Sequence, residues 1–198
     1  MVATVSIRYD FGGADAAPGS SVDVDSYGPP CIKFKLADNA TIDGNNKLEI
    51  PGLGLGPYYS CWKHMYLYCD NPDGHTISDV KFYTDGTNSY GTGIDVKVGL
   101  QFPTKNSGST AGYEVAHAAV GGTSAELVVG HGGITTSATV FDYTVGAGAL
   151  AITISEAGSV INAAGETANY VLLQASVADS ASAGTKTNET YTFSYTEA

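Results

Sequence analysis

Residues 94–101, IDVKVGLQ, alternate strictly between two kinds of side chain. One set is apolar: Ile94, Val96, Val98 and Leu100. The other set is polar: Asp95, Lys97 and Gln101. Successive side chains of an extended chain point to opposite faces, so this stretch predicts a β-strand with one buried face.

The same alternation recurs along most of the chain. It predicts strands over residues 2–9, 32–36, 60–69, 77–84, 94–101, 125–129, 138–144, 150–154, 168–178 and 187–196. Turn dipeptides separate several of them: Asp43-Gly44, Asp73-Gly74 and Asp85-Gly86. The best helical candidate is residues 111–119. We therefore expect an all-β chain, an antiparallel β-sandwich of the jelly-roll or immunoglobulin-like Greek-key type with little or no helix.

The first thirty residues differ in character from the rest. Residues 10–30, DFGGADAAPGSSVDVDSYGPP, are small, acidic and rich in glycine and proline. We expect residues 1–30 to form a flexible N-terminal arm that begins with a strand. Residues 31–198 are then predicted to form a single β-sandwich domain.

The charge of the chain argues against some classes of binding partner. The chain has 198 residues, with 20 acidic and 9 basic side chains and a net charge of −11. The shortage of Lys and Arg argues against nucleic acid, whose phosphates are bound by basic patches, and against anionic membranes. The start, MVATVSIRYDF, lacks the basic and apolar regions of a signal peptide, so we expect synthesis in the cytoplasm without export.

Candidate metal sites are few. The three cysteines, Cys31, Cys61 and Cys69, do not form a disulfide framework, and we expect buried thiols, although Cys31 could pair with either of the others. His64 should face away from Cys61 and Cys69 across one strand. Oxygen ligands of the kind calcium prefers occur in two turns, at Asp70, Asp73 and Asp85. These turns are either ordinary Asx turns or parts of one calcium site, and otherwise no cofactor is expected.

No catalytic constellation emerges from the sequence. There is no Gly-x-Ser-x-Gly motif, and the available glutamates, Glu126, Glu156 and Glu166, show no pairing in sequence. We therefore expect that the chain is not an enzyme.

Aromatic residues gather on one face of the predicted strand 60–69: Trp62, Tyr66 and Tyr68. Such a row packs in a core or at a subunit interface, or else binds sugar rings as an exposed strip. We take these residues as candidate interface residues and keep a carbohydrate-binding module as an alternative.

Four segments are distinctive when taken together: residues 1–13 (MVATVSIRYDFGG), 58–70 (YYSCWKHMYLYCD), 77–98 (ISDVKFYTDGTNSYGTGIDVKV) and 170–198 (YVLLQASVADSASAGTKTNETYTFSYTEA). These segments resemble a family of small structural proteins of tailed phages and phage-like elements. The chain departs from the family pattern in its cysteines and in residues 31–50, CIKFKLADNATIDGNNKLEI.

The resemblance implies a virion component, a capsid decoration or cement protein that binds the outer capsid surface and stabilises the particle. Its implied partners are the major capsid protein and further copies of itself, as a trimer or another homo-oligomer. The alternative is a secreted surface or filament subunit joined by donated strands. Two glycosylation sequons, beginning at Asn39 and Asn188, motivate that extracellular alternative.

Overall fold

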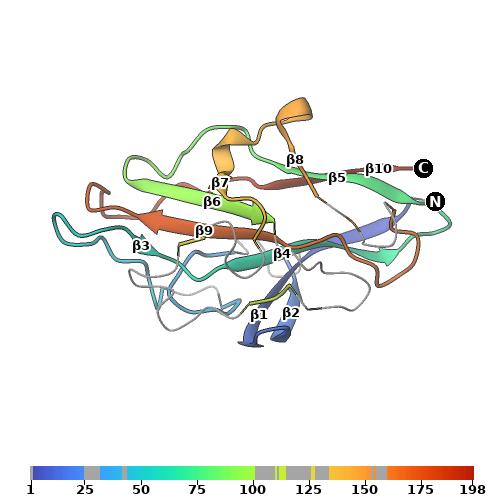
Figure 1. The fold of residues 1–198 in the computed structure, drawn as a ribbon, viewed down its shortest axis with the longest axis horizontal. Coiled ribbons are helices and arrows are strands. Elements are labelled where there is room, and N and C mark those ends of the chain that lie inside the picture. The colour runs from blue at the N-terminus through green and yellow to red at the C-terminus, as the bar shows by residue number, and fades with distance from the viewer. Residues whose placement is uncertain are drawn as a thin grey trace.

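Two strands that are far apart in the sequence pair at the centre of the larger sheet in the computed structural model (Figure 1). β4 (Lys63–Asn71) and β9 (Val171–Val177) run antiparallel, with Met65 opposite Val171. The structure describes residues 2–24, 32–41, 44–100, 110, 112–114, 126–127, 134–152, 154 and 160–198.

The remaining strands extend this pair into two sheets. The larger sheet has the order β2-β1-β4-β9-β6-β7, and β3 also pairs with β9. Its other strands are β1 (Thr4–Ala14), β2 (Ala17–Asp23), β3 (Tyr58–Tyr59), β6 (Ile94–Leu100) and β7 (Ala138–Thr139). The smaller sheet has the order β10-β5-β8 and consists of β5 (Ile77–Tyr83), β8 (Leu150–Ala151) and β10 (Thr192–Glu197).

The prediction of an all-β antiparallel sandwich is confirmed. Every named strand pair is antiparallel. The chain crosses between the sheets from β4 to β5, from β5 to β6, from β7 to β8, from β8 to β9 and from β9 to β10. The helices in the described residues are the short 3-10 segments η3 (Val140–Asp142) and η4 (Gly146–Gly148). None of them is long and apolar enough to cross a membrane.

The larger sheet is buried on both of its faces. One face meets the smaller sheet in a core that includes Leu67, Phe82, Val98 and Leu173. The opposite face carries a second apolar cluster: Trp62, Tyr66, Tyr113, Leu127, Ile134, Tyr170 and Leu172. This double burial explains why the middle of β4, residues 65–69, is an unbroken run of apolar and aromatic residues, as strands covered on both faces are.

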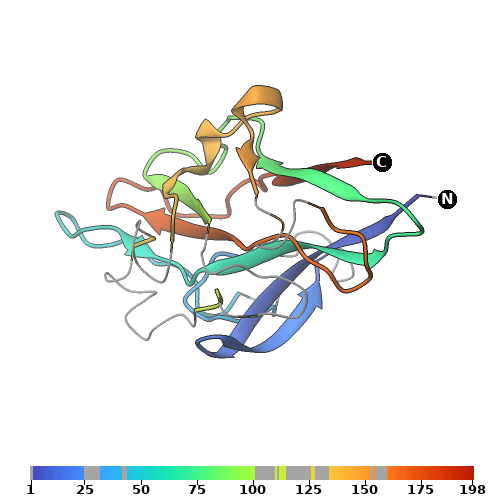
Figure 2. The ribbon, with the colours of Figure 1, turned by 45° about the vertical axis from the view of Figure 1, so that its right-hand side comes forward.

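The structure corrects the expectation of a flexible arm over residues 1–30, because most of this stretch forms β1 and β2. β1 pairs with β4 from Thr4 to Asp10, and β2 pairs with β1, so residues 4–23 form a hairpin inside the larger sheet (Figure 2). The small residues serve close packing in this hairpin. Gly13 has φ +83°, and a Cβ there would lie 2.3 Å from the Ala17 carbonyl oxygen. Residues 25–30 lie outside the described residues.

Other differences between prediction and structure are local. The predicted strand 138–144 is strand only at β7, and η3 follows it directly. Within 32–36 the structure has a single bridge, from Lys35 to Lys47. The predicted strand 125–129 and the helix candidate 111–119 fall mostly outside the described residues.

Candidate functional site

The aromatic row of Trp62, Tyr66 and Tyr68 lies largely in the interior of the protein. The exposed fraction is 1% for Trp62 and 3% for Tyr66, and both pack in the second apolar cluster. Tyr68 is half-buried, with the Arg8 guanidinium carbon 3.6 Å from its ring centroid. Of the uses considered for this row, packing in the core is the one that Trp62 and Tyr66 show, because other parts of the same chain cover them; neither residue forms an exposed sugar-binding strip.

A buried carboxylate, Asp10, lies beside this aromatic row. It accepts hydrogen bonds from the hydroxyl groups of Tyr66 (3.0 Å) and Tyr170 (2.5 Å). Burial, and then the nearby Asp10 charge, raises the pKa of both tyrosines far above its usual range. Both hydroxyl groups therefore stay protonated and remain donors to Asp10, as a buried carboxylate requires.

His64 occupies the same face of β4, opposite Asp10 in the register of β1 and β4. Its side chain contacts the rings of Tyr113 and Tyr170, with centroid distances of 4.6 Å and 5.4 Å. Its Nε2 accepts a hydrogen bond from the Glu114 backbone N–H at 3.4 Å. Burial lowers its pKa to about 4, so the imidazole is neutral at neutral pH. Across β4, Cys69 joins the core between the sheets, as predicted; Cys31 lies outside the described residues.

A second polar cluster surrounds Asp38. Its carboxylate accepts hydrogen bonds from the Tyr9 hydroxyl at 2.7 Å, from the Gly12 backbone N–H at 2.7 Å and from the Tyr113 hydroxyl at 2.9 Å. The buried Lys63 ammonium donates to the Tyr9 hydroxyl at 3.0 Å, and burial lowers the pKa of Lys63. The half-buried carboxylate of Asp38 thus joins β1 to Tyr113.

Sequence reasoning missed both clusters. One signal was available for Lys63, since it alternates with Cys61, Met65 and Leu67 on a face that is otherwise apolar. No comparable signal marks Asp10 or Asp38. The Asp10 cluster joins β1 to β4 and Tyr170, and the Asp38 cluster joins β1 to residues 38 and 113; holding segments together is a usual role of hydrogen-bonded polar groups inside a fold.

The three aspartates suggested for calcium do not come together. Asp70 forms an ion pair with Arg8 at 3.1 Å, and Asp85 accepts a hydrogen bond from the Thr87 N–H at 2.8 Å. Asp73 and Asp85 flank opposite ends of β5, which at ~3.3 Å per residue places them roughly 20 Å apart. The single site built from all three is therefore wrong. Among the described residues, no three His, Cys, Asp or Glu side chains are grouped as metal ligands would be.

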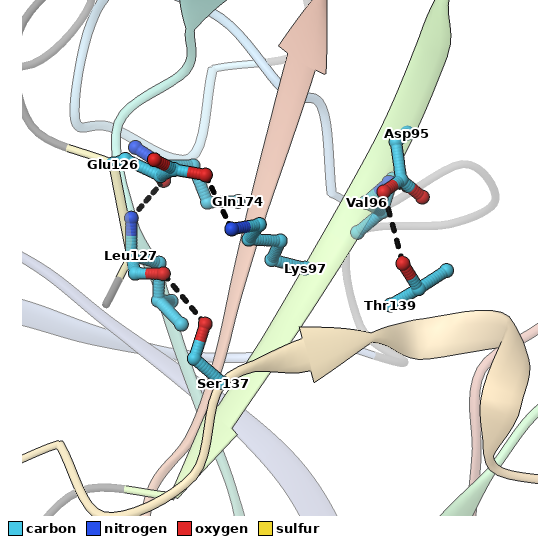
Figure 3. Close-up of polar contacts among 8 residues, drawn as sticks. All are labelled: Asp95, Val96, Lys97, Glu126, Leu127, Ser137, Thr139 and Gln174. Atoms are coloured by element: carbon cyan, nitrogen blue, oxygen red, sulfur yellow. Dashed lines mark hydrogen bonds and ion pairs between the residues drawn. The ribbon is translucent and has the colours of Figure 1, made fainter. Parts of the chain in front are cut away.

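Two of the glutamates considered for catalysis, Glu126 and Glu166, make contacts within the chain, and Figure 3 shows those of Glu126. Glu126 pairs with Lys97 of β6, and beside it the Leu127 N–H donates to the Gln174 side chain of β9 at 2.6 Å. Glu166 accepts hydrogen bonds from the backbone N–H groups of residues 162 and 163. Glu156 lies outside the described residues.

Among the described residues, the most exposed large apolar side chain, that of Leu53, belongs to a tight turn before β3. The Leu55 N–H donates to the Gly52 carbonyl at 2.9 Å, and Gly54 has φ +78°. The Gly54 N–H also donates to Asp179 at 2.8 Å, which fixes the turn to the loop after β9. Leu53 is 96% exposed and Leu55 is 56% exposed. The turn projects at the end of the molecule opposite the termini (Figure 1).

This turn, residues 52–55, has the properties of a docking element, and we call it the leucine turn. Its backbone is held by hydrogen bonds, so binding would order few additional groups. Residues 50–57 carry no charge, and the two leucines present apolar surface to solvent. Comparison of the chain with protein-family models, curated proteins and solved structures gave no match.

Proposed function

We propose that the chain is a non-enzymatic structural protein of a tailed-phage-type particle, one that decorates the outer capsid surface and stabilises it. The carrying observation is the leucine turn, a preorganised apolar projection on a β-sandwich body. Binding to a protein surface is the most direct use of such an element, since burying an exposed leucine stabilises a complex by about 1.5–3 kcal/mol.

The identity of the particle is supported by the sequence resemblance. The resembling segments 58–70, 77–98 and 170–198 contain β3, β5, β9 and β10 and most of β4 and β6. These strands pair with one another, as β4-β9-β6 in one sheet and β10-β5 in the other. The resemblance therefore covers the connected centre of the fold, which favours a shared architecture over a set of unrelated short matches.

The proposed partners are the major capsid protein and further copies of this chain, and the proposed location is the virion surface. The carboxylates first considered for catalysis, Glu126 and Glu166, make internal contacts that suit a structural role. Because Trp62 is buried, the carbohydrate-binding alternative has lost the residue that motivated it.

The proposal is tested on purified particles from cells that carry the gene. Mass spectrometry should find the chain at a copy number close to that of the capsid protein. Finding only trace copies in washed particles would reject a decoration role.

The leucine turn is tested by rebinding of purified protein to particles that lack it. Leu53→Ser should weaken binding by roughly 10- to 100-fold, equivalent to losing one buried leucine. Val145→Ser is the matched control, since Val145 is 71% exposed and lies next to η4, away from the turn. Equal binding by both variants would show that the leucine turn is not the docking element.

A further inference from the structure

The two sheets expose edges of very different kinds. β7 and β8 are two residues long, too short to template another strand. β2 contains Pro18, and its turn is covered by a hydrogen bond from the Ala16 N–H to the Tyr113 carbonyl at 2.8 Å. β10 is six residues long and contains no Pro, Gly or Lys, the residues that usually protect an edge. In the described part of the chain, β10 pairs only with β5.

The backbone of β10 is regular along this edge. Ser194 pairs with Lys81 and Thr196 with Ser78, so the extra residue of the irregular region belongs to β5. Asp79 of β5 has φ +51°, as a bulge residue can. The side chains of β10 therefore alternate between the two faces without interruption, and its backbone N–H and C=O groups alternate regularly between the β5 side and the open edge.

The hydrogen bonds of Ala198, just after β10, show which backbone N–H and C=O groups of β10 point toward β5 and which point to the open edge. Ala198 and Thr76 exchange both of their backbone hydrogen bonds, at 3.0 Å and 2.9 Å, so the Ala198 N–H points toward the β5 side. Direction alternates along a strand, so the N–H of Ser194 also points toward β5. The N–H and C=O groups of Phe193 and Tyr195 then point to the open edge.

β10 is complementary to itself when two copies run antiparallel about Ser194. In that register Phe193 lies opposite Tyr195 of the second copy, and these residues present the outward-pointing backbone groups to each other. Thr192 lies opposite Thr196 of the second copy. Aromatic pairs and threonine pairs of this kind stabilise neighbouring strands.

Side-chain faces and charge agree with this register. Phe193 and Tyr195 both pack toward the core between the sheets, so pairing keeps aromatic rings on one face and hydroxyl groups on the other. Glu197 is the only charged residue of β10. In this register it lies opposite Tyr191, and its carboxylate already accepts from the Ala3 N–H at 2.8 Å.

We propose that two copies of this chain pair through β10, which joins their three-stranded sheets into one continuous sheet with a twofold axis at Ser194. The partner is a second copy because the aromatic rings, hydroxyl groups and outward-pointing backbone groups of β10 are complementary to those of a second β10 that runs antiparallel to it. This surface is separate from the leucine turn, so pairing does not depend on particle binding.

Sedimentation of the purified full chain tests the pairing. The wild-type mass should move from monomer toward dimer between about 1 µM and about 200 µM, a range suited to a small interface. Ser194→Glu should weaken dimerisation at least about tenfold, because like charges then lie opposite each other at the axis. In the single chain the new carboxylate faces Lys81, so the melting temperature should not fall.

Ser78→Glu is the charge-matched control. It adds the same charge to β5, one strand away from the axis, and should dimerise as the wild type does. A wild type that stays monomeric throughout, or a Ser194→Glu variant that dimerises as tightly as the wild type, would overturn the proposal. Open polymers in place of a dimer would also overturn it, because pairing about a twofold axis closes.

Cross-linking gives a second, positional readout. In a Cys31→Ser background, Ser194→Cys should form a covalent dimer under mild oxidation, because residues opposite each other in a pair without backbone hydrogen bonds lie ~4.5 Å apart at Cα, within disulfide range. Ser78→Cys is the control and should remain uncross-linked. Equal cross-linking of the two variants, or none at residue 194, would count against the register.

Discussion

Acid should weaken the fold through His64. His64 is 1% exposed and its imidazole packs against the rings of both Tyr113 and Tyr170, and burial lowers its pKa from 6.5 to about 4. In the unfolded chain His64 therefore binds a proton below about pH 6.5, whereas in the folded chain it binds one only near or below about pH 4. The stability associated with neutral His64 is complete above pH 6.5 and is lost progressively between pH 6.5 and about pH 4.

The size of this loss follows from the pKa difference. A drop from 6.5 to about 4 corresponds to roughly 3 kcal/mol at about 1.4 kcal/mol per pH unit. Single domains are stable by only about 5–15 kcal/mol in total. Protonation of His64 in the unfolded chain is thus expected to remove a substantial part of the free energy of unfolding before pH 4 is reached.

Urea unfolding of the wild type and of His64→Gln measures the effect. The glutamine side-chain oxygen can accept the Glu114 N–H but does not titrate, so the difference between the two proteins isolates His64 from all carboxylates and the other histidines. That difference should change by about 3 kcal/mol between about pH 7 and about pH 4. His75→Gln is the control, since His75 is half-buried at the surface and pairs with Glu197 at 3.2 Å.

Parallel pH curves for the wild type and His64→Gln would refute this reasoning. So would an NMR titration that finds His64 protonating near pH 6.5. Asp38 and Asp10 favour the charged imidazole, whereas burial and Lys63 oppose it. A high measured pKa would mean that the two carboxylates outweigh burial.

Three further substitutions probe the hairpin, the buried carboxylate and the surface. Gly13→Ala should lower the free energy of unfolding by about 2 kcal/mol or more, whereas Gly91→Ala, with positive φ but open space, should lose only about 1 kcal/mol; equal losses in urea unfolding would contradict the proposed backbone clash. Tyr170→Phe should cost about 1–3 kcal/mol because Asp10 loses a donor, and an unchanged melting curve would show that this hydrogen bond is unimportant. Asp70→Asn should change stability by less than about 1 kcal/mol, since its ion pair is partly exposed; a larger loss would point to a role beyond that pair.

The strands of the core could be predicted because their side chains alternate. Val96 and Val98 of β6, and Val80 and Phe82 of β5, are buried as the period of two requires. β1 and β2 were harder, because their connection is made of small residues that are equally common in flexible segments. The pairing of β1 with β2 shows that this stretch is a hairpin, and the pairing of β1 with β4 shows that the hairpin belongs to the larger sheet.

The polar interior could not be predicted in the same way. Asp10 is near Tyr170 only because β1 and the approach to β9 lie on either side of β4. Asp38 reaches Tyr9 through the chain fold of residues 32–41, which contains no regular strand. Such contacts depend on tertiary arrangement, and local sequence patterns carry no information about them.

The position of β9 has a consequence for how the chain is made. β9 pairs with β4 and β3 on one side and with β6 on the other, yet it is the second-last strand to be synthesised. During translation β1, β2 and β4 can assemble early, while the second edge of β4 waits for residues 171–177. Such distant pairings slow folding, so the nascent chain carries an open, apolar strand for most of its synthesis. Molecular chaperones would therefore meet this chain mainly at β4.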